Sequence, residues 1–255
     1  MSGEAIRLEM PDGVADAYLA RPDGEPAPDT SERPPAVLLI CDAYGLRPQI
    51  EAMADRIAAA GYLVLAPNVF YRAGRPPVVS LEGLDDPERR GEVFGRVWPL
   101  IQDLTPDLIA RDGAAYLDEL ERRGRGGPAA IVGYCMGGRL GWRISTAFPD
   151  RVALLTGFHV GSLATDDPES PHRSAAALDS ELYFGFADED PSMTAEQIST
   201  LERALDDARL SYRAEVYPGA AHGYTMADTP AYDEAAAERH HETLLDLLSR
   251  TFSAD

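Results

Sequence analysis

The chain has 255 residues, of which 45% are hydrophobic, and its formal net charge is −20. This length and composition favour one large globular domain, so we expect residues 1–255 to form a single domain. The strong negative charge argues against nucleic acid and anionic membrane surfaces as partners, because like charges would repel.

Cysteine usage and the N-terminal sequence indicate where the protein functions. The only two cysteines, Cys41 and Cys135, are too few for a disulfide framework. Met1 is followed by polar and acidic residues, which is not the pattern of a signal peptide. No apolar run approaches the roughly 20 residues that a membrane-spanning helix needs. We therefore predict a cytoplasmic protein with reduced cysteines and no membrane partner.

Apolar periodicity and turn residues predict a hairpin followed by alternating strands and helices. A loop rich in proline and acidic residues, 21–35, separates the hairpin from the rest. The predicted elements are, in chain order, hairpin strands at 5–9 and 15–20, a strand at 36–41, a helix at 50–60, a strand at 62–66, helices at 91–102 and 106–123, a strand at 129–132, a helix at 139–147, strands at 152–158 and 182–185, a helix at 194–208, a strand at 212–217 and a helix at 232–250.

This alternation predicts the α/β class, with a mostly parallel sheet covered by helices on both faces. Ligands of such sheets bind beyond the carboxyl ends of the strands. Two long connections start at such ends, an irregular segment over 68–90 and a polar loop over 160–178. Both are candidate elements of a binding site.

The segment Gly133-Tyr134-Cys135-Met136-Gly137 joins a buried strand to a helix. A nucleophile flanked by small residues at this junction is typical of a nucleophile elbow, in which a strained turn exposes the reactive side chain. The free N–H groups of the following helix favour a thiolate and an oxyanion. The alternative is a buried cysteine in a tight glycine turn. We predict Cys135 as a nucleophile.

An activated cysteine needs a base, and the base needs an acid that orients it. His222 follows the last predicted strand and is the predicted base. The acid is expected after the strand at 182–185, where Asp188, Glu189 and Asp190 stand in a row. We predict Asp188 as the acid, with Asp190 as the alternative and Glu189 as a surface charge.

The oxyanion hole is expected to combine two backbone N–H groups. The N–H of Met136 follows the nucleophile directly. The second would come from Ala43 or Tyr44, in the loop after the strand at 36–41, where Gly45 permits a tight turn. We predict Met136 and Ala43 as the donors.

The chain resembles the dienelactone hydrolase family of α/β-hydrolases over nearly its whole length. The resemblance rests on the elbow at Cys135 and on these segments in the same order: Cys41-Asp42-Ala43-Tyr44-Gly45, Gly61–Arg72, Gly185–Asp188 and Tyr217-Pro218-Gly219 with His222-Gly223. It implies an α/β-hydrolase fold and a triad of Cys135, His222 and Asp188. It also implies hydrolysis of a small lactone or ester through a thioester-like acyl-enzyme, without a cofactor.

Three departures from the family pattern bear on substrate binding. Asp42 stands where the family usually has glutamate. The family binds the substrate carboxylate with arginines, and the candidates by region are Arg72, Arg75, Arg89, Arg90 and Arg96. His159 stands at a strand end where an aromatic residue is common. We predict Asp42, Tyr44, Arg72 and His159 as substrate contacts.

Two other functions are compatible with these residues. One is a broader carboxylesterase or thioesterase on the same triad, and the other is a catalytically idle scaffold that binds a small ligand. No metal-ligand spacing and no nucleotide-binding glycine motif is present in the sequence. We therefore expect a small ester or lactone as the partner, no cofactor, and a monomer or homodimer.

Overall fold

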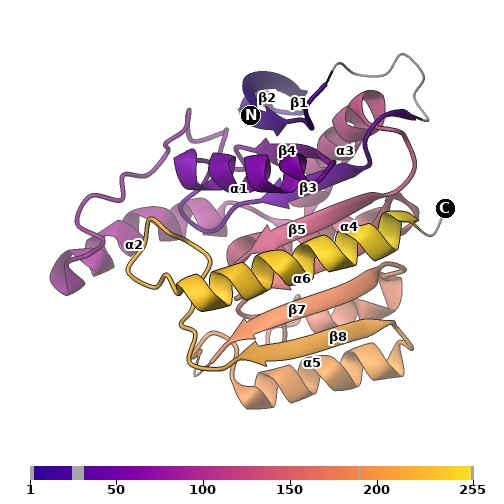
Figure 1. Ribbon diagram of the computed structural model, residues 1–255. Coiled ribbons are helices and arrows are strands. Elements are labelled where there is room, and N and C mark those ends of the chain that lie inside the picture. The colour runs from indigo at the N-terminus through magenta and orange to yellow at the C-terminus, as the bar shows by residue number, and fades with distance from the viewer. Residues whose placement is uncertain (1–2, 25–31, 189, 254–255) are drawn as a thin grey trace. The chain divides into compact units, whose positions relative to one another are not determined.

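The computed structural model describes residues 3–24, 32–188 and 190–253 (Figure 1). Part of the predicted loop at 21–35 and Glu189 therefore lie outside the described residues. The chain divides into two compact units, residues 1–129 with 228–230 and residues 130–227 with 231–255. Each unit consists of β-strands with helices packed against them. That the whole chain behaves as one domain stays a prediction.

In the described residues of the first unit, the strands lie in the order β1-β2-β4-β3. The predicted hairpin is confirmed, because β1 and β2 pair antiparallel and Gly13, at the turn, has a φ of 135°. β2 pairs antiparallel with β4, and β3 pairs parallel with β4. The elements of this unit are β1 (Glu4–Met10), β2 (Gly13–Ala20), β3 (Ala36–Ile40), α1 (Pro48–Ala59), β4 (Leu63–Pro67), α2 (Pro87–Gln102) and α3 (Pro106–Arg123).

The sequence explains why these segments adopt these states. Every residue of β4 is buried, as expected of a parallel strand that is covered on both faces. α1 buries Ile50, Met53 and Ile57 on one side, at the spacing of three and four residues that an amphipathic helix requires. α1 and α3 both pack on the strands of this unit.

In the second unit, the part of the chain that the structure describes has its strands in the order β5-β6-β7-β8. β6 and β7 pair parallel, as do β7 and β8. Helices α4 and α6 both pack on β6, and Figure 1 shows α6 running across the near face of these strands. The elements are β5 (Ala129–Tyr134), α4 (Met136–Ala147), η2 (Pro149–Arg151), β6 (Val152–Phe158), η3 (Pro171–Ala177), β7 (Glu181–Ala187), α5 (Ala195–Asp207), β8 (Tyr212–Tyr217) and α6 (Glu234–Ser253).

Two details of the second unit differ from the sequence prediction. The predicted polar loop at 160–178 contains a short 3₁₀ helix, η3. Helix α4 begins at Met136, directly after Cys135, and not at residue 139. Gly137 and Gly138 have low helix propensity, but a Cβ on Gly138 would lie 2.2 Å from Cγ2 of Val160. Close packing on the segment after β6 therefore decides where this helix starts.

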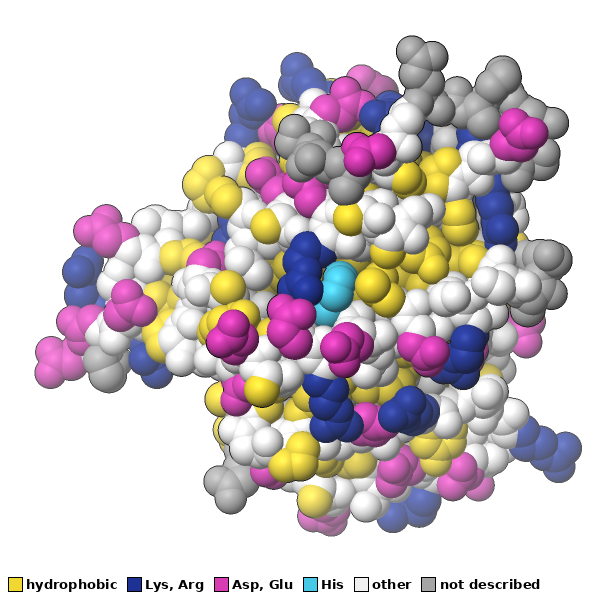
Figure 2. Space-filling model, viewed as in Figure 1, with side chains coloured by type: hydrophobic (Ala, Val, Ile, Leu, Met, Phe, Trp, Pro, Cys, Tyr) yellow, Lys and Arg dark blue, Asp and Glu magenta, His cyan; other side chains and the backbone are white. Residues whose placement is uncertain are grey.

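The predicted α/β class is confirmed by the parallel strands and the helices that cover them. On the face drawn in Figure 2, acidic and basic side chains are interspersed and do not form separate patches. Within the described ranges, none of the helices has the length and apolarity that crossing a membrane would require.

Candidate active site

Cys135 lies at the sharp turn between β5 and α4. It is the N-cap residue of α4, with φ 50° and ψ −116°, a conformation that is strained for a residue with a side chain. A Cβ on Gly133 would lie 2.5 Å from the backbone of Gly137, so this position accepts only glycine. The turn leaves Cys135 partly exposed. These features match the nucleophile elbow that the sequence predicts.

His222 reaches Cys135 from the loop that follows β8. Its Nε2 lies 3.0 Å from Sγ of Cys135. On the other side of the ring, Nδ1 lies 2.5 Å from Oδ2 of Asp190. Cys135, His222 and Asp190 thus form one continuous chain of hydrogen bonds. The structure brings together the predicted nucleophile and the predicted base.

The carboxylate at Nδ1 of His222 belongs to Asp190, the alternative acid of the sequence analysis, so the first choice of Asp188 for this contact is corrected. Oδ2 of Asp188 accepts a hydrogen bond of 2.8 Å from the N–H of Gly219. Its own N–H donates to the carbonyl of Ala220 at 2.8 Å. Asp188 follows the last residue of β7, where its polar groups meet the backbone of the loop after β8. Asp190, two residues further on, is the residue that reaches the imidazole.

Ser192 holds the carboxylate of Asp190 in this orientation. Its backbone N–H and its hydroxyl donate to Oδ1 of Asp190 at 2.8 and 2.7 Å, which leaves Oδ2 for His222. The hydroxyl also lies 3.3 Å from Nδ1 of His222. The sequence analysis did not single out Ser192. An aspartate whose side chain bonds the backbone two residues later is a common turn, and Asp190-Pro191-Ser192 is compatible with it.

Within this hydrogen-bonded triad, each group shifts the pKa of its neighbours. Burial lowers the pKa of His222, but Cys135 and Asp190 outweigh burial and raise it to about 10. Burial alone would raise the pKa of Asp190. Its hydrogen bonds to His222 and Ser192 outweigh burial and bring the pKa below its ordinary value. At neutral pH the imidazole therefore carries a proton beside the sulfur, and the carboxylate is ionised.

His159 packs against the imidazole of His222 and is fully buried. Its side chain is 0% exposed, and its ring centre is 5.4 Å from that of His222. Nε2 hydrogen-bonds the hydroxyl of Thr225 at 2.8 Å, whereas Nδ1 is buried without a partner. Burial, with His222 and His240 nearby, lowers the pKa of His159 well below its ordinary value. The predicted substrate contact is therefore corrected to a neutral, buried packing residue.

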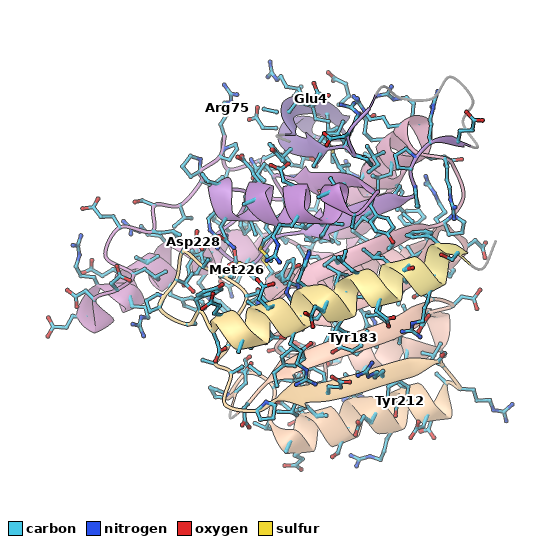
Figure 3. The ribbon with its side chains drawn as sticks, in the orientation of Figure 1. Glu4, Arg75, Tyr183, Tyr212, Met226 and Asp228 are labelled. Carbon is cyan, nitrogen blue, oxygen red and sulfur yellow. The ribbon has the colours of Figure 1, made fainter. Side chains whose placement is uncertain are left out.

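Asp42 belongs to a buried ion-pair cluster in the first unit. Its two carboxylate oxygens accept from Arg47 at 2.7 and 3.0 Å. Arg47 also donates to Asp228 at 2.7 and 3.0 Å, and Figure 3 labels Asp228 on the loop that precedes α6. The N–H of Tyr44 donates to Asp42 as well, at 3.0 Å. This geometry gives Asp42 the task of holding its loop and does not support a contact with substrate.

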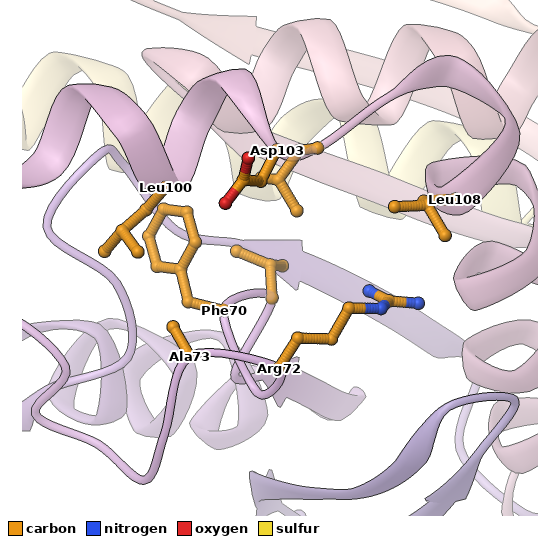
Figure 4. A pocket seen from close by; sticks show the side chains of 8 residues that line it. Phe70, Arg72, Ala73, Leu100, Asp103 and Leu108 are labelled. Atoms are coloured by element: carbon orange, nitrogen blue, oxygen red, sulfur yellow. The ribbon is translucent and has the colours of Figure 1, made fainter.

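Arg72 is also occupied by carboxylates of the first unit. It donates to Asp112 at 2.7 and 2.8 Å and to Asp12 at 2.8 and 2.9 Å. The stem of Arg72 borders a mainly apolar pocket of about 360 Å³ (Figure 4). The other residues that line this pocket are Val69, Phe70, Ala73, Leu100, Asp103, Leu104 and Leu108. These ion pairs do not support Arg72 as a cation for substrate.

The remaining predicted residues lie in two different units. Met136 is the first residue of α4, and Ala43 is buried in an apolar cluster with Val79 and Val97. Tyr44 packs against the same cluster. Their roles in an oxyanion hole and in substrate binding stay predictions. In the part of the chain that the structure describes, no group of three or more His, Cys, Asp or Glu could hold a metal ion.

Solved structures of known proteins share this fold. A Klebsiella pneumoniae protein provisionally described as a dienelactone hydrolase has a TM-score of 0.81 and 21% identity, with 96% of each chain covered. A dienelactone hydrolase-like promiscuous phosphotriesterase from metagenomic libraries has a TM-score of 0.72 and 18% identity, covering 98% of this chain and 99% of the other. These likenesses confirm the predicted α/β-hydrolase fold.

Sequence comparison agrees with the structural one. A Salmonella typhi protein provisionally named carboxymethylenebutenolidase is 26% identical, over 94% of this chain and 89% of its own length. A mouse carboxymethylenebutenolidase homolog is 27% identical over 78% of each chain. The model of the dienelactone hydrolase family matches residues 15–252. The chain therefore belongs to the dienelactone hydrolase family and is a hydrolase.

Proposed function

We propose that this hydrolase cleaves a small lactone or ester through an acyl-enzyme on Cys135. His222 transfers the proton between the reacting groups. Asp190 orients the imidazole and raises its pKa, which favours the protonated ring. One observation carries the proposal, namely the continuous hydrogen-bond chain from Sγ of Cys135 through His222 to Asp190, with distances of 3.0 and 2.5 Å. A nucleophile, a base and an orienting acid at these distances are the parts that acyl transfer requires.

The chemistry follows from the positions of the protons. The sulfur of Cys135 attacks the carbonyl carbon, and an S–C bond forms while the carbonyl oxygen becomes an oxyanion. The N–H of Met136, at the start of α4, is the proposed first donor to this oxyanion. When the C–O bond to the leaving group breaks, Nε2 of His222 gives its proton to the departing oxygen. Water then attacks the thioester carbonyl carbon while His222 takes one of its protons. The S–C bond breaks, the acid product leaves, and the sulfur of Cys135 beside the protonated His222 is restored.

The choice of a lactone or activated ester rests on two supports. A thiolate is a weak base and expels enolates or other good leaving groups more readily than amines. The sequence relatives of this chain include proteins named carboxymethylenebutenolidase. A broader carboxylesterase or thioesterase would use the same three residues, and only the rates on different substrates would distinguish it.

The first experiment replaces the nucleophile. Cys135→Ala is expected to lower kcat/KM for an enol-lactone by about 10⁴-fold or more, because removal of a triad nucleophile leaves only binding and oxyanion stabilisation. Cys41→Ala is the matched control, since Cys41 is the other cysteine and is buried at the end of β3. Unchanged thermal unfolding would show that the fold is intact. Full activity in Cys135→Ala would overturn the proposal.

A substrate panel then distinguishes the functions. Enol-lactones, p-nitrophenyl esters and acyl thioesters are compared by their ratios of kcat/KM. We expect the highest value for an enol-lactone. A preference for simple esters or thioesters would favour the broader esterase, and no turnover at all would favour an idle scaffold.

A further inference from the structure

The segment 159–162, which directly follows β6, packs against two elements of the active site. The ring of His159 packs on the imidazole of His222, with 5.4 Å between the ring centres. Val160 packs on the first turn of α4, where a Cβ on Gly138 would lie 2.2 Å from Cγ2 of Val160. One short segment therefore borders both the base and the helix that begins at the nucleophile.

The same segment also contacts the residue that orients the acid. A Cβ on Gly161 would lie 2.2 Å from Oγ of Ser192 and 2.7 Å from its Cβ. The N–H of Ser162 donates to the carbonyl of Ser192 at 2.7 Å, so the two loops are also joined through the backbone. Ser192 in turn holds Asp190 through its N–H and its hydroxyl, at 2.8 and 2.7 Å. The position of the acid thus depends on how closely residue 161 approaches Ser192.

This contact, and not the backbone conformation, requires glycine at position 161. The φ of Gly161 lies outside the left-handed region, so an alanine would fit the backbone. The three atoms nearest to the added methyl group would all belong to Ser192. Because packed atoms do not approach to 2.2 Å, the hydroxyl or the backbone of Ser192 would have to move. Either movement disturbs the hydrogen bonds to Oδ1 of Asp190 that leave Oδ2 for His222.

We propose that Gly161 is a positioning residue of the active site. The missing side chain lets Ser192 approach, and Ser192 then fixes the carboxylate of Asp190 against the imidazole. Two donors on Oδ1 remove the rotational freedom of this carboxylate, whose side chain is 2% exposed. Gly161 and Ser192 touch no substrate here and act through the acid. The inference rests on the proposed function, because it concerns the orientation of the same triad.

The test observes the hydrogen bond between Asp190 and His222 in the absence of substrate. A proton on Nδ1 of an imidazole that donates to a carboxylate gives a far-downfield resonance in nuclear magnetic resonance spectra. We expect this resonance to move upfield, or to be lost through exchange, in Gly161→Ala and in Ser192→Gly. Where hydrolysis is measured, kcat/KM should fall by about tenfold in each variant, mainly through kcat, which is the size of one charge-assisted hydrogen bond.

A double-mutant cycle shows whether Gly161 acts through Ser192. In Ser192→Gly the methyl group introduced by Gly161→Ala has no Oγ and no Cβ to meet, so the double variant should resemble Ser192→Gly alone. Additive losses would overturn the proposal. Gly157→Ala is the matched control, because its Cβ would crowd Val160 at 2.6 Å and Phe184 at 3.0 Å. This control should lower the temperature of unfolding and keep the resonance.

The remaining outcomes separate positioning from general strain. An unchanged resonance in Gly161→Ala or in Ser192→Gly would overturn the proposal, as would an equal change in Gly157→Ala or absence of the resonance from the unmutated protein. If Gly161→Ala alone does not fold, folding of the double variant would support the contact, and its failure to fold would overturn it. The resonance needs no turnover, so it decides the role of Gly161 even if the proposed hydrolysis fails.

Discussion

Each unit of the molecule contains a buried carboxylate that is bound to a cation, but the two cations differ. In the first unit, Arg47 binds Asp42 and Asp228. In the second unit, the imidazole of His222 binds Asp190 and contacts Cys135. Both clusters carry hydrogen bonds of similar length, so geometry alone does not tell a structural ion pair from a catalytic one.

The two clusters differ in whether their cation can release a proton. An arginine stays protonated at any pH that proteins tolerate, so the cluster around Arg47 is a fixed arrangement of charges. His222 has a pKa of about 10 and a sulfur within 3.0 Å, so it can give up a proton during a reaction and take it back. The lesson is that a buried charge pair becomes a candidate for catalysis when one partner can titrate and faces a nucleophile.

The largest effect on stability is expected when the arginine cluster is broken. Arg47→Met leaves Asp42 buried without a cation, which should lower the free energy of unfolding by about 3–5 kcal/mol. Urea denaturation measures this change. Arg75→Met is the control, because Arg75 pairs with Asp16 from a side chain that is 83% exposed and should show no measurable loss. Equal losses in the two variants would contradict the structural role given to Arg47.

Removing the charge next to His222 should act on chemistry more than on stability. Asp190→Asn is expected to lower kcat/KM by about 10²-fold, because the imidazole loses its orienting and charging partner. The pKa of His222 should fall from about 10 toward its ordinary 6.5, as nuclear magnetic resonance titration of the ring would show. Asp188→Asn is the matched control, since Asp188 bonds the backbone of Gly219 and Ala220 in the same loop region. A larger effect from Asp188→Asn would reverse our assignment of the acid.

The same shift in pKa predicts a pH dependence of stability. The folded protein keeps a proton on His222 that the unfolded chain releases above pH 6.5. The contribution of this group to stability is therefore complete below pH 6.5 and is lost as the pH rises through about 10. Asp190→Asn should reduce this loss.

The smallest effect is expected behind the imidazole. Thr225→Val removes the hydroxyl that bonds Nε2 of His159, and an unsatisfied buried ring nitrogen should cost about 1 kcal/mol of stability. We also expect a decrease of a few fold in kcat/KM, because His159 packs on His222. Ser145→Ala removes another buried hydroxyl of the same unit, bonded to the carbonyl of Gly141, and should affect stability alone. Equal kcat/KM in the two variants would rule out a positioning role for His159.

Several features could be predicted because they depend on short stretches of sequence. The runs of apolar residues and their glycine and proline boundaries placed the strands and helices to within a few residues. The glycines around Cys135 predicted the strained turn, and in the structure a Cβ on Gly133 would lie 2.5 Å from the backbone of Gly137. The position of His222 after the last strand followed from the same alternation.

Other features depended on side-chain directions that no local pattern contains. Asp188 and Asp190 have the same chemistry and lie two residues apart, and the path of the loop decides that one bonds Gly219 and the other His222. His159 has the residue type of a substrate contact, but its burial makes it a neutral packing residue.

By itself, the sequence determined the α/β order of elements, the elbow at Cys135 and His222 as its partner, because periodicity and turn chemistry act between near neighbours. Only the tertiary structure decided which carboxylate completes the hydrogen-bond chain and which arginines are already paired with carboxylates. These outcomes depend on contacts between residues far apart in the chain, and a shift of one or two residues along a loop is enough to change them.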